Sequence, residues 1–193
     1  MHWYLTHPQV RIDPAIPVPD WGLSDVGRAR IMTLAGAPWI RRFGRIVSSG
    51  ERKAMESAQA VGLAIGVPVE LAEASHENDR SSTGFLPPQE FERMADAFFA
   101  SPQDSVRGWE RAIDAQARIV AVVRQVLQAR PRTPTLFVGH GGVGTLLKCW
   151  LRGRDITRAE DQGPGGGGNH FGFTLSPKGV LHDWLPLETP PPG

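Results

Sequence analysis

The chain has 193 residues, of which 40% are hydrophobic and 21% are charged, values that are typical of one soluble domain. There are 21 Lys and Arg residues and 20 Asp and Glu residues, so the formal net charge is only +1. We therefore expect neither nucleic acid nor a membrane surface as a partner. The single cysteine, Cys149, excludes an intrachain disulfide and a cysteine-based zinc site.

Other signals in the sequence are weak. The first residues contain no basic segment followed by a long apolar one, so no secretory leader is expected. No stretch approaches the ~20 apolar residues of a membrane span. We therefore expect a cytoplasmic protein, and no pattern in the chain calls for a metal or a cofactor.

The first half of the chain alternates short apolar runs with helical patterns. In chain order, the pattern predicts strand 3–5, loop 14–19, helix 25–35, strand 45–49, helix 51–65 and strand 67–71. Ser24 or Asp25 is expected to cap the first helix, and Gly66 is expected to end the second. Apolar residues available for burial on the predicted helices include Val26, Met32, Leu63 and, further on, Ile113.

The second half of the chain predicts an insertion and then the rest of the core. Residues 73–86 are polar and acidic and precede a helix at 87–100, so residues 73–111 are predicted to form a small cap within a single domain spanning 1–193. The pattern continues with helix 105–128, strand 135–138, helix 143–151, glycine tract 163–168 and strands 171–175 and 180–185. We expect the tract to be a weakly structured loop and the last two strands to form an edge hairpin.

This alternation predicts an α/β domain of three layers, α/β/α, with a mainly parallel sheet. Ligands of such domains bind at the carboxyl ends of the strands. Three predicted strands end in polar pairs, which are Thr6-His7, Ser48-Ser49 and Gly139-His140. We expect these ends to converge on one site.

His7 and His140 are the sharpest chemical feature, because each directly follows an apolar strand. Histidine titrates near neutrality and can act as a nucleophile or a proton carrier. Each histidine alone would more often be a capping or packing residue. Their equivalent positions at two strand ends favour a shared site.

Several nearby groups could hold an anion. The helix after Ser49 begins with Arg52 and Lys53, and its amino end offers backbone N–H groups. Arg11, near the first strand end, raises the same possibility. Gly141 would let the backbone approach a ligand closely. Alternatively, the basic side chains are simply exposed to solvent, and Gly141 belongs to an ordinary turn between a strand and a helix.

Four motifs in register resemble those of the histidine phosphatase superfamily, which includes phosphoglycerate-mutase-like enzymes. Thr6-His7-Pro8 matches the family's Arg-His-Gly motif, and residues 23–28 match its Leu-Thr-x-x-Gly helix start. Residues 48–58 match the Ser-Ser strand end and the following helix, which carries Arg-Ala and Gln-Thr-Ala in the family. Gly139-His140-Gly141 matches its Ser-His-Gly motif. The order and approximate distances match over nearly the whole chain. The resemblance implies the α/β/α fold and phosphoryl-transfer chemistry.

The resemblance also implies roles for individual residues. His7 falls on the nucleophile that becomes a phosphohistidine, and His140 falls on the histidine that contacts the transferring phosphoryl group. Thr6 falls on the arginine of the family's Arg-His-Gly motif. Lys53 falls on the arginine of the helix motif, which is a phosphate ligand. An acidic residue after the third strand usually protonates the leaving group. Glu73 is the first choice for this acid, and Glu77 and Asp79 are close competitors.

The departures from the family pattern bear on activity. Thr6 carries no charge, and Lys53 lacks the planar two-point grip of a guanidinium. Loss of such contacts in phosphoryl transfer could cost several kcal/mol. Arg11, Arg52 or Arg80 could refill the pocket.

Two main hypotheses follow from these residues. The first is a phosphomonoester hydrolase that acts through a phosphohistidine on a small phosphorylated substrate. The second is a weak or inactive relative that binds a phosphorylated ligand or a protein partner. A mutase is a third and weaker reading, because 193 residues leave little room for the longer cap that it usually needs. The sequence leaves the substrate and the oligomeric state open.

Overall fold

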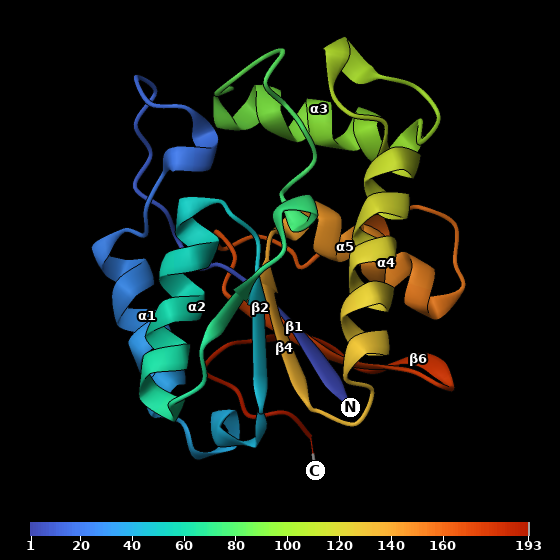
Figure 1. The fold of residues 1–193 in the computed structure, drawn as a ribbon. Helices are drawn as coiled ribbons and strands as arrows, with labels where there is room; N and C mark the ends of the chain where they lie inside the picture. Colours follow the sequence, from blue (N-terminus) through green and yellow to red (C-terminus); the bar gives the residue numbers. More distant parts are fainter. Residues whose placement is uncertain (193) are drawn as a thin grey trace.

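Six strands form one sheet in the order β3-β2-β4-β1-β5-β6 in the computed structural model, which describes residues 1–192 (Figure 1). The strands are β1 (His2–Thr6), β2 (Arg45–Ser48), β3 (Val69–Leu71), β4 (Thr135–Gly139), β5 (Asn169–Leu175) and β6 (Lys178–Pro186). β1 to β4 are mutually parallel, whereas β5 and β6 pair antiparallel at one edge. The mainly parallel sheet and the edge hairpin are confirmed.

Helices cover both faces of the sheet. They are α1 (Asp25–Gly36), α2 (Arg52–Ile65), α3 (Pro88–Ala100), α4 (Ala112–Ala129) and α5 (Gly141–Arg152). Figure 1 shows α1 and α2 on one side, α4 and α5 on the other, and α3 across the carboxyl ends of the strands. The predicted α/β/α class is therefore confirmed.

Side-chain alternation along β1 divides the core into two halves. Trp3 and Leu5 pack in the cluster that contains residues of α1 and α2. Tyr4, between them, packs in the other cluster, with residues of α4 and α5. Successive strand residues point to opposite faces, so a strand covered on both sides is apolar throughout.

The helix ends follow local sequence signals. The Ser24 side chain accepts a hydrogen bond from Gly27 N at 3.1 Å, which caps α1 as expected. Gly66 ends α2 with φ +72°, a conformation that glycine adopts without strain. In the described residues 1–192, none of the helices is both long enough and apolar enough to cross a membrane.

Two expectations about the helices were wrong. The fourth helix begins at Ala112 rather than near residue 105, because residues 106–108 form a short 3-10 turn in which Arg107 has φ +50°. Several apolar side chains expected to be available for burial are instead exposed: Val26, Met32, Leu63 and Ile113. Each helix packs through a narrower face than the apolar pattern indicates.

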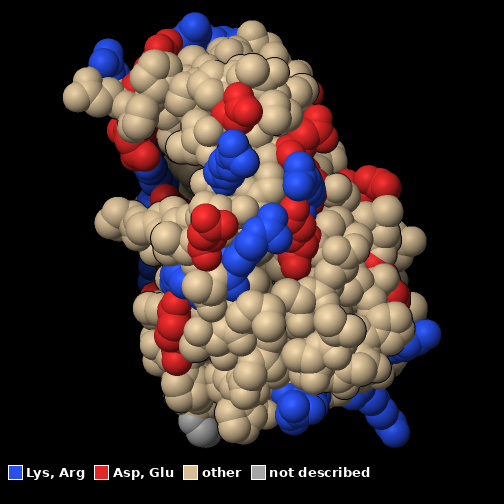
Figure 2. All heavy atoms as spheres, turned by 90° about the vertical axis from the view of Figure 1, so that its left-hand side faces the viewer, with Lys and Arg blue, Asp and Glu red and all other residues tan. Residues whose placement is uncertain are grey.

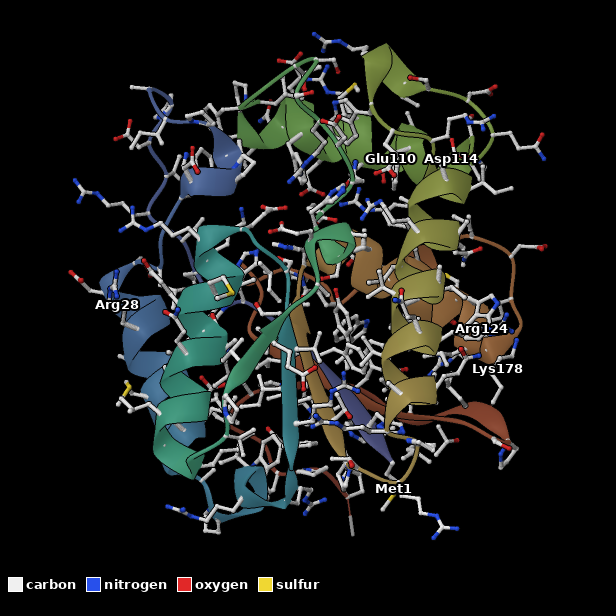
Figure 3. All side chains as sticks on the ribbon, viewed as in Figure 1. Met1, Arg28, Glu110, Asp114, Arg124 and Lys178 are labelled. Carbon is white, nitrogen blue, oxygen red and sulfur yellow. The ribbon has the colours of Figure 1, made fainter. Side chains whose placement is uncertain are left out.

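The segment between β3 and α4 is tied to α4 by one arginine. The Arg118 guanidinium donates to the carbonyls of Ala74, His76 and Glu77 at 2.8 to 3.3 Å. It also pairs with Glu110, which Figure 3 shows at the upper end of α4. Glu110 N in turn donates to Asp79 O at 2.9 Å. These bonds hold residues 74–79 above the strand ends.

Candidate active site

Three strand ends meet at one edge of the sheet, as expected. β4 lies between β1 and β2, with Thr6 level with Gly139 and Ser48 level with Val138. His7 N continues this pairing by donating to Gly139 O at 3.0 Å. The polar residues that follow β1, β2 and β4 therefore lie side by side.

His7 is held with one ring nitrogen free. Its Nδ1 lies 2.8 Å from Pro8 O, and because a carbonyl can only accept, Nδ1 carries the hydrogen. Nε2 of the neutral ring then keeps its lone pair. Burial, with smaller effects from His140 and Lys53, lowers the pKa of His7 to about 3. The ring is thus uncharged at neutral pH and able to act as a nucleophile.

His140 packs against His7, with ring centroids 5.3 Å apart and planes at 65°. Its side chain is fully buried, and Nε2 lies 2.6 Å from Ser49 Oγ and 3.5 Å from Glu51 Oε1. Its Nδ1 has no hydrogen-bond partner among residues 1–192. Burial lowers the pKa of His140, and the carboxylates of Glu51 and Glu77 oppose that shift.

Lys53 is neutralised by a neighbouring carboxylate. Its ammonium is buried, forms an ion pair with Glu51 and donates to Val18 O at 2.8 Å. Burial raises the pKa of Glu51, but His140, Lys53 and hydrogen bonds outweigh that effect and bring it to about 2. Lys53 does not line the cavity beside His7. The charge that the sequence suggested for an anion is therefore already paired.

Thr6 is bound by two residues from the far end of the chain. Its hydroxyl donates to Gln162 Oε1 at 2.7 Å and accepts from Asn169 N at 3.0 Å. These partners lie more than 150 positions away in sequence, and sequence reasoning missed both. Thr6 thus has its own polar partners and brings no charge to the site.

The glycine tract is ordered where it meets His7. Gly167 and Gly168 are buried, and Gly168 N donates to His7 O at 2.9 Å. The Arg30 guanidinium donates to the carbonyls of Gly167 and Gly168 at 3.0 and 3.1 Å. The tract has no regular secondary structure, as expected, but the expectation of weak structure was wrong for these last two residues.

A cavity of about 460 Å³ opens beside His7. Its lining includes His7, Glu77, Asn78, Arg80, Phe91, Trp109, Gly141, Gly142, Asp161 and Gln162. The Arg80 guanidinium lies 5.0 Å from the Phe91 ring centroid and 5.6 Å from that of Trp109. The structure thus brings His7, Gly141 and Arg80 together around one space.

Arg11 and Arg52 lie elsewhere. Both are exposed and line a separate cavity of about 520 Å³ between the loop after β1 and the start of α2. Arg52 Nε donates to Glu56 Oε1 at 2.8 Å. Figure 2 shows basic and acidic groups interspersed on this side of the molecule rather than one basic patch.

The family model for the histidine phosphatase superfamily (branch 1) matches residues 13–165. The chain belongs to this superfamily. No curated protein matches the chain. The match extends from the loop after His7 to the glycine tract, so it includes His140 but not His7.

Solved structures share the fold at low identity. A mycobacterial glucosyl-3-phosphoglycerate phosphatase in complex with inorganic phosphate has a TM-score of 0.74 and 21% identity, with 97% of this chain and 98% of that chain covered. A phosphoserine phosphatase from Entamoeba histolytica, in complex with 3-phosphoglyceric acid, has a TM-score of 0.73 and 15% identity, with coverage of 95% and 96%. YhfR of Bacillus stearothermophilus has a TM-score of 0.71 and 20% identity, with 94% of each chain covered.

The acidic residues proposed from the superfamily resemblance occupy three different settings. Glu73 is exposed, lies against Gly50 and does not line the His7 cavity. Glu77 lines the cavity, where its carboxylate accepts from Gly142 N and Val143 N at 3.0 Å. Burial raises the pKa of Glu77, but the charges of Arg80 and His140 and the hydrogen bonds from Gly142 N and Asn78 N outweigh that effect, so the pKa is lowered. The pKa of the exposed Asp79 is lowered by its bonds to Ser81.

Asp161 is a cavity carboxyl that sequence reasoning missed. It accepts from Gln162 N at 2.7 Å and from Thr145 Oγ1 at 3.1 Å. Burial raises its pKa, so this histidine phosphatase relative holds a carboxyl in the cavity that retains its proton more readily than Glu77. No motif marked Asp161, because it lies in the irregular segment between α5 and β5.

Proposed function

We propose that the protein is a phosphomonoester hydrolase that acts through a phosphohistidine at His7. The observation that carries this proposal is the His7 ring, which is neutral, fixed through Nδ1 to Pro8 O, and adjacent to the cavity. Membership of the histidine phosphatase superfamily supports it. So do two structural neighbours, which are phosphatases in complex with inorganic phosphate and with 3-phosphoglyceric acid.

The proposed reaction has two displacements. His7 Nε2 attacks phosphorus, the bond from phosphorus to the ester oxygen breaks, and the departing oxygen takes a proton from an acid. Water then attacks the phosphohistidine and gives a proton to the carboxylate left by the acid, the P–N bond breaks, and phosphate leaves with His7 and the acid restored. His140 lies beside the transferring group, and residues 73–111 serve as the cap that encloses a small phosphorylated substrate.

Asp161 is the acid that the cavity geometry favours. It lines the same cavity as His7 and has a raised pKa, as a proton donor requires. Glu73 remains the prediction from family resemblance. The two assignments are separated by Asp161→Asn and Glu73→Gln. Only loss of the true acid should slow hydrolysis of an alkyl phosphate, by roughly 10²- to 10⁴-fold, while sparing p-nitrophenyl phosphate, whose leaving group needs little help.

A second candidate function is phosphate-ligand binding with little or no turnover. The observation that favours it is the loss of free charge at both arginine positions, since Thr6 bonds to Gln162 and Lys53 pairs with Glu51. Electrostatic stabilisation is the main catalytic contribution in phosphoryl transfer. Such a protein would keep the fold and the anion site but would hydrolyse phosphate esters slowly or not at all.

The deciding experiment measures p-nitrophenyl phosphate hydrolysis by the wild type, His7→Ala and His182→Ala. His182 lies on β6 and does not line the cavity, so it serves as the matched control. We expect activity to vanish in His7→Ala only, and an alkaline quench with labelled substrate to place phosphate on His7. Wild-type rates in His7→Ala would refute the hydrolase mechanism. Phosphate binding without any turnover in the wild type would instead favour the second candidate.

A further inference from the structure

A buried nitrogen atom in the wall of the cavity that His7 lines lacks a hydrogen-bond partner. Only four buried side-chain polar atoms in the described residues 1–192 are unpaired, and two of them are Asn78 Nδ2 and His140 Nδ1. Asn78 lines the cavity and is 6% exposed, while His140 is fully buried against His7. An unpaired buried polar group costs about 1–3 kcal/mol. The unpaired Asn78 Nδ2 at this cavity indicates a ligand that accepts a hydrogen bond there.

A positive charge lies on the same side of the cavity. Arg80 forms no ion pair with any of residues 1–192, in contrast to Arg158, which lines the same cavity but pairs with Glu92 and Asp96. The guanidinium of Arg80 lies over the rings of Phe91 and Trp109, and although its charge lowers the pKa of the Glu77 carboxyl, these two groups form no ion pair. Its five N–H donors therefore remain available to an anion.

Hydrogen bonds from the segment just before α4, from Arg118 on α4 and from the first turn of α5 hold the segment that carries Asn78 and Arg80. Arg118 bonds the carbonyls of His76 and Glu77, and Glu110 accepts from Asp79 N at 3.1 Å. The Glu77 carboxylate joins the segment to the first turn of α5. Donors that are fixed before binding lose little entropy when the ligand arrives.

We propose that Asn78 and Arg80 together bind the phosphoryl group of the substrate, in place of the two arginines on whose positions Thr6 and Lys53 fall in the superfamily resemblance. The proposal rests on the proposed function for the identity of the ligand. Arg80 supplies the charge and a two-point grip, and Asn78 Nδ2 supplies a neutral donor.

Binding of inorganic phosphate and of orthovanadate, measured by calorimetry, tests the proposal without requiring turnover. The variants are Arg80→Ala, Arg80→Lys and Asn78→Ala. Arg107→Ala is the matched control, because Arg107 is an exposed arginine of the same segment that pairs with Glu90. We expect phosphate affinity to fall roughly 10- to 100-fold in Arg80→Ala and about 5-fold in Asn78→Ala, from the usual strengths of charged and neutral hydrogen bonds. Arg107→Ala should bind like the wild type.

Arg80→Lys keeps the charge and the stem over the aromatic rings, so it tests the two-point grip even if Arg80→Ala folds poorly. Its affinity should lie between those of the wild type and Arg80→Ala. The proposal is overturned if Arg80→Lys and Asn78→Ala both bind phosphate as tightly as the wild type, or if the wild type binds neither anion. His7→Ala separates the two proposals. Retained phosphate binding with retained hydrolysis in that variant would refute the hydrolase mechanism but leave the phosphoryl site standing.

Discussion

Gly167→Ala should disturb the His7 backbone, and Gly163→Ala provides its matched control. Both glycines belong to the same tract and have nearly equal φ angles, +84° and +80°. They differ in their surroundings. A β-carbon at Gly167 would lie 2.3 Å from His7 O, whereas none of residues 1–192 has an atom within 4 Å of one at Gly163.

The magnitude follows from the contacts that must change. The left-handed φ costs an alanine about 1–2 kcal/mol at either position. At Gly167 the backbone must also move, which weakens the Gly168 N to His7 O bond and the Arg30 bonds to two carbonyls. At roughly 1 kcal/mol for each hydrogen bond, the free energy of unfolding should fall by about 3–5 kcal/mol in Gly167→Ala. The corresponding drop in Tm is about 6–20 °C, against about 2–8 °C for Gly163→Ala.

Urea and thermal unfolding of the two variants give the comparison, and p-nitrophenyl phosphate hydrolysis reports on His7. We expect Gly167→Ala to lose most activity at a temperature where it is still folded, because its backbone contact displaces the proposed nucleophile. Gly163→Ala should keep the wild-type rate. Equal destabilisation of the two variants would refute the argument that the last glycines of the tract support His7.

Three further predictions concern charge. Glu51→Gln should strengthen phosphate binding about tenfold or more, since it removes a carboxylate beside His140 and releases the ammonium of Lys53; weaker binding in calorimetry would contradict this. The folded-state pKa values of His7 and His170 are about 3 and 4, so the unfolded chain takes up protons first as the pH falls. The contribution of these two histidines to the free energy of unfolding should therefore be complete above pH ~6.5 and should decline as the pH falls towards 4. His170→Gln should flatten that decline in urea titrations, and an unchanged slope would count against it. Alkyl phosphate hydrolysis should fall on the alkaline side as Asp161 loses its proton, and Asp161→Asn should abolish that limb of the pH profile; a limb that persists would exclude Asp161 as the acid.

Local sequence patterns were sufficient for the fold and for the two histidines. The apolar runs, the Ser24 cap and Gly66 depend on interactions over a few residues, which a linear pattern records directly. Parallel strands place their carboxyl ends at one edge, so the sequence predicted that His7 and His140 lie at the same edge, and the order of the strands in the structure makes β1 and β4 neighbours. The resemblance to the histidine phosphatase superfamily added the expected roles.

Only the tertiary structure decided which charges reach the cavity. The sequence favoured Arg11 and Arg52 as anion-binding residues and offered Arg80 only as a group that could refill the pocket. The fold brings only Arg80 to the cavity beside His7. Lys53 is paired with Glu51 because α2 buries both side chains together. Hydrogen bonds such as that between Thr6 and Gln162 join segments 156 residues apart. Whether two such groups meet depends on how the whole chain packs, and neither residue type nor local spacing contains that information.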